Sequence, residues 1–317
     1  MGPGIMGQLA AMPAHARDEH QDCIRCHAPL KEQADSLSAA IAGNQAISPL
    51  HEQGVVCAAC HLRGYEWYGP PRRDGSSPSG DLKQLPHDGW KASPAFSDSR
   101  FCAACHQFEK DEYALNGKLL ENTYEEWKAS RFAREGRSCQ SCHMPERRHL
   151  WRGIHDPEMV RSGVHIDAGL PEVSGQNVAA ALTIRNTGVG HYFPTYVTPH
   201  VVAQGYQEDA NGAMIAGTLL EHVIARQVPL DLSRKIADTR IPPDGEARLD
   251  YRARLDRRAA ALVFRVRVEP DAFYSGFYES ILSDGSARKD AAQIRAALEQ
   301  SRKSGFEVYS KRQLLNP

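Results

Sequence analysis

Cys23-Ile24-Arg25-Cys26-His27 is the first of four copies of one five-residue pattern, Cys-x-x-Cys-His. The other copies are Cys57-Ala58-Ala59-Cys60-His61, Cys102-Ala103-Ala104-Cys105-His106 and Cys139-Gln140-Ser141-Cys142-His143. This pattern is the attachment signature of c-type haem. Its two thiols add across the vinyl groups of one porphyrin, and the histidine that follows binds the iron as proximal ligand. We therefore predict four covalently attached haem c groups, each with one of the proximal iron ligands His27, His61, His106 and His143.

The number and spacing of the motifs separate this interpretation from two alternatives. The chain has 8 cysteines, and all of them lie in the four motifs. A zinc site built from Cys-x-x-Cys pairs usually has about 12–20 residues between the pairs, whereas 30, 41 and 33 residues separate the motifs here. Zinc also gives no reason for the histidine at the fifth position. Disulfide frameworks belong to short secreted chains, so covalent haem is favoured over both.

Length and charge restrict the function further. The 317 residues allow about two domains, and the formal net charge of −1 gives no field that favours nucleic acid or an anionic membrane. No apolar run approaches the ~20 residues of a membrane span. Haem attachment in bacteria takes place outside the cytoplasm, so we expect a periplasmic or extracellular protein. Residues 1–17 lack the features of an export signal, and we interpret the printed start as trimmed or misplaced.

The two halves of the chain differ in composition. Residues 1–160 contain 8 valines and isoleucines, all 8 cysteines and all 4 tryptophans, whereas residues 161–317 contain 21 valines and isoleucines and no cysteine. A segment so poor in aliphatic side chains cannot build an ordinary core, and four porphyrins can supply the missing apolar bulk. We predict an α+β chain. A haem-packed, mostly helical and loop domain at 1–160 precedes a β-sandwich-like domain with a C-terminal helix at 161–317.

Local patterns place the expected elements. In the first half we expect helices at 18–27, 36–46, 99–110 and from a capping box formed by Thr123 and Glu126, with a Pro- and Gly-rich loop at 69–86. In the second half, apolar and polar residues alternate at 178–184, 247–255 and 262–268, which is typical of strands in a sandwich. A helix at 287–303, with Ala291, Ile294 and Leu298 on one face, is the last expected element. The arginines along 248–267 are interpreted as a solvated strand face rather than a docking site.

The remaining histidines are candidates for the distal ligands of six-coordinate irons. His51, His87 and His155 lie in loops beside the motifs, and His191 lies in a rigid loop that leaves a strand, Gly188-Val189-Gly190-His191-Tyr192-Phe193-Pro194-Thr195. We predict these four as distal ligands, with His20 and His149 in reserve. Three further histidines are interpreted as ordinary strand residues: His165, His200 and His222.

Several of these segments resemble the bacterial multihaem cytochromes c and are similar to the tetrahaem electron carriers that serve hydroxylamine oxidoreductase. The resemblance rests on the four motifs, on the segments 87–90 and 142–145, on His-x-Trp-x-Gly-x-His at 149–155, and on the loop 190–195. Tyr196 stands where relatives often have glycine. The resemblance implies haems in close parallel and perpendicular pairs, mostly with two histidine ligands. It also includes relatives that form extracellular conducting filaments.

Three functions are compatible with these features. The first is electron transfer between redox partner proteins outside the cytoplasm, since two imidazoles per iron leave no position for a substrate. The second is an oxidoreductase with one five-coordinate catalytic haem. The third is a subunit of an extracellular cytochrome filament, which requires self-association. We favour the electron carrier, because spare histidines are plentiful and every motif keeps its proximal histidine.

Overall fold

A computed structural model of the chain describes residues 20–41, 50–287 and 291–315. It contains both helices and sheets, so the predicted α+β class is confirmed at that level. The chain divides into two compact units. The first unit comprises Met1–Gln107, Ser138–Cys142 and Tyr278–Glu299, and the second comprises Phe108–Arg137, His143–Phe277 and Gln300–Pro317. This contact-based division differs from the expected boundary at residue 160, which stays a prediction about independent folding domains.

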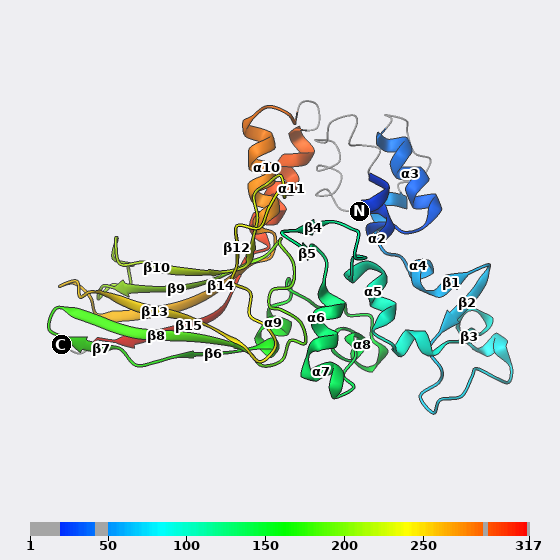
Figure 1. Cartoon of the computed structure of the whole chain (residues 1–317), viewed down its shortest axis with the longest axis horizontal. Coiled ribbons are helices and arrows are strands. Elements are labelled where there is room, and N and C mark those ends of the chain that lie inside the picture. The colour runs from blue at the N-terminus through cyan, green and yellow to red at the C-terminus, as the bar shows by residue number, and fades with distance from the viewer. Residues whose placement is uncertain (1–19, 42–49, 288–290, 316–317) are drawn as a thin grey trace. The chain divides into compact units, whose positions relative to one another are not determined.

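The first unit consists of short helices joined by loops (Figure 1). Its α-helices in the first part of the chain are α2 (His20–His27), α3 (Lys31–Ile41), α4 (Cys57–His61) and α5 (Arg100–His106), and α8 (Cys139–His143) begins in it. Its 3-10 turns are η2 (Leu50–Gln53), η3 (Leu82–Gln84), η4 (Pro86–Asp88) and η5 (Pro94–Ser97). A small sheet joins β1 (Leu62–Arg63), β2 (Glu66–Gly69) and β3 (Lys91–Ala92). The expected loop at 69–86 is therefore irregular apart from η3.

Few apolar side chains are buried in the first half of the chain. Among the described residues up to 160, the buried apolar ones are Ile24, Ala28, Leu37, Leu115, Phe132 and Val160. Six such residues cannot supply the apolar burial that a domain of this length needs. This scarcity agrees with the composition of the sequence.

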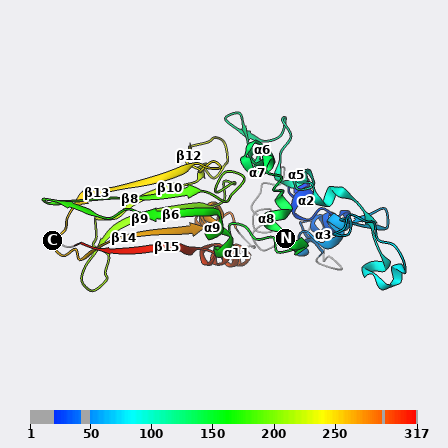
Figure 2. The same ribbon diagram turned by 90° about the horizontal axis from the view of Figure 1, so that it is seen from below.

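The second unit is built on two antiparallel sheets (Figures 1 and 2). One sheet has the order β10-β9-β14-β15, with strands β10 (Leu220–Ile224), β9 (His200–Glu208), β14 (Ala261–Glu269) and β15 (Phe306–Leu314). The other has the order β13-β8-β6, with strands β13 (Glu246–Arg254), β8 (Asn177–Asn186) and β6 (Val164–Ala168), and β7 (Glu172–Ser174) also pairs with β8. Side chains from both sheets share one buried cluster, as in a β-sandwich.

The alternation predicted from the sequence is confirmed in these strands. In β13, Leu249 and Tyr251 are buried while Arg248, Asp250 and Arg252 are exposed. The arginines of β13 are solvated as expected, and Arg248 pairs with Asp250. Arg265 and Arg267 lie in β14 of the other sheet and are half-buried, so the arginines of 248–267 do not form one solvated face. The three histidines assigned to strands also lie there, in β6, β9 and β10.

Shorter elements surround the sandwich within the second unit. They are the hairpin β4 (Ala114–Leu115) and β5 (Lys118–Leu119), the helices α6 (Thr123–Ala129), α7 (Arg131–Arg134) and α9 (Pro157–Gly163), the turn η6 (Pro145–Arg147), and the paired strands β11 (Arg226–Gln227) and β12 (Ala237–Asp238). The loop that follows β8 runs through residues 187–199. Phe193 of this loop exchanges two backbone hydrogen bonds with Ile241, each 2.8 Å long, so the loop is fixed to the segment before β13.

Some expected elements differ from the structure. The expected helix at 99–110 is shorter, and that at 36–46 is α3, which begins at Lys31; residues 18–19 and 42–46 lie outside the described residues. The capping box is wrong: Asn122 occupies the N-cap position, and the Glu126 carboxylate bonds elsewhere.

The C-terminal end of the chain also differs from the prediction. The helix expected at 287–303 is α11 (Ala291–Lys303), with Ile294 and Leu298 buried as predicted, and a further helix, α10 (Ala272–Ser283), precedes it. The chain does not end in this helix, however. Strand β15 follows and pairs with β14, because its buried residues fit the edge of that sheet. Within the described part of the chain, no helix is long and apolar enough to cross a membrane.

Candidate functional site

All four Cys-x-x-Cys-His motifs lie on helices. They form the end of α2, the whole of α4, the end of α5 and the whole of α8. In a helix, positions i and i+3 share one face, so each pair of cysteines points to one side and the following histidine continues that turn. The backbones of His20 and Cys23 belong to α2, but their side chains lie outside the described part of the structure.

Within the first unit, cysteines from different motifs come together. The thiols of Cys26 and Cys105 interact, and so do those of Cys102 and Cys139. The contact with Cys139, together with burial, raises the pKa of the Cys102 thiol, and the pKa of the Cys139 thiol is lowered to about 7 by its contact with Cys102. Motifs that are far apart in the sequence are therefore neighbours in this unit.

The segment before α5 fixes the start of α8. The backbone N–H of Cys139 donates to Ser99 Oγ at 3.0 Å, and Gln140 Nε2 donates to the Asp98 carbonyl at 2.8 Å. Ser99 is 2 % exposed. Buried hydrogen bonds of this kind hold their groups in one arrangement, so the third and fourth attachment motifs keep a fixed spacing.

His61, the histidine of the second motif, is held by two contacts within the first unit. Its Nδ1 lies 2.7 Å from the Tyr68 carbonyl oxygen, and its ring stacks on Phe96 with 4.8 Å between centroids. A carbonyl oxygen can only accept, so Nδ1 carries the proton and Nε2 carries the lone pair of the neutral ring. This is the tautomer that binds a metal through Nε2.

His143 and His191 face each other in the second unit. Their rings are 11° from parallel with centroids 6.4 Å apart. Nδ1 of His143 donates to the Arg152 carbonyl at 2.6 Å, and Nδ1 of His191 donates to the carbonyl of its neighbour Tyr192 at 2.9 Å. Both rings are therefore oriented by backbone carbonyls, and Nε2 carries the lone pair in each. The carbonyl contacts thus leave Nε2, the usual metal-binding nitrogen, as the acceptor atom of both rings.

His51 and His87 lie in the first unit, each against a different partner. His51 is 4 % exposed, and its Nδ1 lies 2.8 Å from Ser36 Oγ on α3. Burial lowers the pKa of His51. His87 is exposed and stacks on Trp67 with 4.2 Å between centroids, and its backbone has a φ of 57°. Such a left-handed φ is uncommon outside glycine, so this loop holds His87 in a defined, strained position.

His155 and His149 are both exposed in the segment that follows the fourth motif. His155 Nε2 lies 3.1 Å from Asp271 Oδ2, in an ion pair within the second unit. His149 packs its ring near Trp151, with 6.2 Å between centroids. Nε2 of His155, the more usual metal-binding nitrogen, is therefore engaged by a carboxylate.

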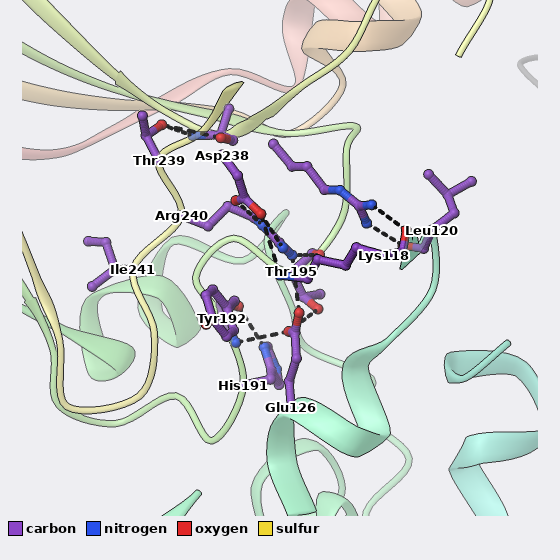
Figure 3. Close-up of polar contacts among 12 residues, drawn as sticks. Lys118, Leu120, Glu126, His191, Tyr192, Thr195, Asp238, Thr239, Arg240 and Ile241 are labelled. Atoms are coloured by element: carbon purple, nitrogen blue, oxygen red, sulfur yellow. Dashed lines mark hydrogen bonds and ion pairs between the residues drawn. The ribbon is translucent and has the colours of Figure 1, made fainter. Parts of the chain in front are cut away.

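The loop that carries His191 adjoins a buried cluster of charged groups, all in the second unit (Figure 3). The side chains of Glu126 and Arg240 are 3 % and 1 % exposed, with 3.3 Å between Oε1 and Nη1. Arg240 also binds Asp238 through Nε and Nη2, at 2.7 and 2.9 Å. Local sequence patterns do not predict this cluster, because its charged residues come from distant segments; Glu126 fitted only the pattern of a capping box.

The pKa values in the cluster reflect a balance of burial and charge. Burial raises the pKa of Glu126 more than the nearby Arg240 lowers it. Burial also opposes ionisation of Asp238, but the hydrogen bonds and charge of Arg240 outweigh it and lower the pKa of Asp238. Lys118, 4.5 Å above the Tyr192 ring, has its pKa lowered by burial. Arg240 is therefore the centre of the cluster.

Comparisons with known proteins identify the fold. No family model and no curated protein matches the chain. Among solved structures, it is similar to the crystal structure of a penta-heme cytochrome c552 from Thermochromatium tepidum, with a TM-score of 0.59 and 18% identity over 92% of this chain and 83% of that one. A structural genomics target, SoR45, aligns over 33% of this chain and 72% of its own with 12% identity and a TM-score of 0.20, which carries no argument. The chain thus shares the fold of a multihaem cytochrome c over nearly its whole length.

Proposed function

We propose that this protein is a tetrahaem c-type cytochrome that transfers electrons between redox partner proteins outside the cytoplasm. The eight cysteines of the four motifs would hold the haems, and His27, His61, His106 and His143 would be the proximal ligands. The shared fold with a pentahaem cytochrome supports a multihaem protein. Similarity to the carriers that serve hydroxylamine oxidoreductase rests on the sequence motifs and does not name a partner.

The opposed rings of His143 and His191 carry the proposal. A metal–imidazole bond is about 2 Å long, and the centre of an imidazole lies about 1 Å beyond its ligating nitrogen, so two trans imidazoles have centroids about 6 Å apart. The observed separation is 6.4 Å with nearly parallel rings. His143 and His191 would be the residues that hold one haem iron, and the haem would supply one-electron redox chemistry there.

Ligation by two histidines determines the chemistry. A bound haem supplies one-electron redox chemistry, and axial His/His ligation gives it a lower potential than Met/His ligation. The protein holds each imidazole through a hydrogen bond from Nδ1, which sets the tautomer and increases the basicity of Nε2. With both axial positions filled, a substrate cannot reach the metal. Electron transfer is the function that remains.

The closeness of the motifs supports exchange of electrons between haems. In the first unit, cysteines of the first and third motifs are in contact, and so are cysteines of the third and fourth. Porphyrins attached at such neighbouring positions would lie side by side. For the other irons we propose His51 and His87 as distal ligands, because a neighbouring element holds each in one place.

The test is the spectrum of the matured protein. We expect four haems per chain by mass, a fully low-spin oxidised spectrum, and no change at cyanide concentrations that just saturate a five-coordinate haem. Fewer than four haems would contradict the attachment proposal. A high-spin band, or a spectral change at those low cyanide concentrations, would contradict complete His/His ligation.

An oxidoreductase with one open haem is the second candidate, and one observation favours it. Nε2 of His155 is engaged by Asp271 rather than directed to a metal, so one iron would lack its expected distal ligand. In that case cyanide binds one haem of the wild-type protein, and His155→Ala opens no further haem. If His155 is a ligand, the substitution itself creates a high-spin haem.

A further inference from the structure

The loop containing His191 is held from two sides by one buried ion pair. Glu126 Oε2 on α6 accepts the Tyr192 N–H at 3.1 Å and the Thr195 hydroxyl at 3.4 Å. Arg240 Nη1, from the segment after β12, donates to the Thr195 carbonyl at 2.6 Å. Figure 3 shows Glu126 reaching the loop from its helix and Arg240 reaching it from the opposite strand segment.

The contacts fall on backbone atoms close to His191. Tyr192 follows His191 directly, and its carbonyl accepts the hydrogen bond from His191 Nδ1. Tyr192 therefore makes two contacts. Its carbonyl orients the imidazole of His191, and its N–H donates to the Glu126 carboxylate. Asn186 Nδ2 donates to the His191 carbonyl at 3.1 Å, and this carbonyl belongs to the same peptide unit as the Tyr192 N–H. Both polar groups of the peptide that follows His191 are thus held by side chains.

We propose that Glu126 and Arg240 are positioning residues that hold His191 opposite His143, an inference that rests on the proposed role of His191 as a distal ligand. Productive ligation requires a side chain held within about 0.5 Å and 10–20° by its surroundings. The ion pair meets this need, because both of its members bond to the backbone of the loop. It contacts residues 192 and 195 rather than the imidazole, so it acts through the loop.

A purely stabilising role is the competing explanation, and the physics of buried ion pairs weighs against it. Taking two charges out of water costs about as much free energy as their attraction returns. Well-packed apolar residues at the same positions often stabilise a fold equally well. A buried pair is better explained by the arrangement that it specifies. A third contact acts in the same direction: the hydroxyls of Thr123, at the start of α6, and Thr195 lie 2.7 Å apart.

The test measures how firmly His191 occupies its position. Cyanide competes with a distal histidine for the iron, so its apparent dissociation constant falls as the histidine is bound less firmly. His191→Ala gives the intrinsic affinity for cyanide. We expect Glu126→Ala to bind cyanide at one haem at least about tenfold more tightly than wild type, the effect of losing hydrogen bonds from a charged group. Glu126→Gln keeps one acceptor for the Tyr192 N–H, so its cyanide affinity should lie between those of wild type and Glu126→Ala.

The matched control is Glu125→Gln on the same helix. Glu125 pairs with Lys128, and its side chain is 49% exposed, so cyanide binding should equal that of wild type. Arg240→Lys keeps the charge but loses the planar fork that bonds Asp238 and Thr195 together, and it should increase cyanide affinity as Glu126→Gln does. If Glu126→Ala does not fold, the cyanide affinities of Glu126→Gln and Arg240→Lys decide whether the ion pair positions His191.

The outcomes separate the two proposals. If His191→Ala leaves every haem low-spin, the ligand assignment under the proposed function is wrong. If His191→Ala opens one haem, but the Glu126 and Arg240 variants show wild-type cyanide affinity and only a lower Tm, the positioning role is overturned and the ligand assignment stands. Tighter cyanide binding in the order wild type, Glu126→Gln, Glu126→Ala, His191→Ala supports both.

Discussion

The imidazoles of His143 and His191 lie 11° from parallel, with their centroids 6.4 Å apart. One follows an attachment motif on α8, and the other stands in a loop that leaves strand β8 of the sandwich. Under the proposed function, the strand-rich part of the chain supplies a side chain to the redox site. The substitutions below test this relationship and the fold that produces it.

Replacing His191 with methionine should change a potential rather than a spin state. Methionine is itself an axial ligand in cytochromes c and raises the potential relative to histidine. We expect His191→Met to stay low-spin and one of four redox steps to move upward by on the order of 100 mV, measured by spectroelectrochemical titration. His165→Met, on an exposed position of β6, is the control. A shift of the same size in the control would contradict the assignment.

Gly188→Ala should destabilise the loop that carries His191. A Cβ at this position would lie 2.5 Å from the Ser162 carbonyl oxygen, which is backbone and cannot rotate away. Such overpacking costs about 1–3 kcal/mol, which denaturant unfolding can measure. Gly153→Ala is the matched control, since an added Cβ there meets nothing within 4 Å. Equal stability of the two variants would show that the loop does not need its close approach to Ser162.

Chain produced without haem attachment should keep the sandwich and lose order in the helices α2 to α5. The sandwich has its own buried cluster, including Leu182, Tyr251 and Phe264, whereas few apolar side chains are buried in the first half of the described chain. Hydrogen exchange should show protected amides in β8, β9, β13 and β14, and rapid exchange in α2 to α5. Strong protection of α5 without haem would mean that the porphyrins are not its core.

His200 should make the protein less stable as the pH falls. Its pKa is lowered by burial, against a smaller opposing effect of Glu269. The unfolded chain therefore takes up the proton first. Stability is complete above the ordinary histidine pKa of about 6.5 and is lost as the pH falls from that value toward the folded pKa. Between about pH 8 and 5, the free energy of unfolding should fall less steeply for His200→Gln than for wild type. An unchanged slope would exclude His200 as the cause.

Sequence reasoning predicted features that depend on local pattern. Alternating side chains correctly predicted β13, because a strand with one buried face must place apolar residues at every second position. The face of α11 that buries Ile294 and Leu298 was also predicted from local pattern, because residues four apart lie on one side of a helix. Local pattern failed at Thr123 and Glu126, where the spacing of a capping box was present. There Arg240 and the loop after β8 compete for the carboxylate and outweigh the helix end.

The sequence alone determined the four Cys-x-x-Cys-His motifs and the poverty of apolar residues in the first half, because spacing and composition are properties of the chain itself. It also named His191 as a candidate. Only the tertiary structure placed His191 opposite His143, engaged His155 with Asp271, and joined Glu126 to Arg240. These pairings join segments that are distant in sequence, and their geometry depends on packing that no local pattern encodes.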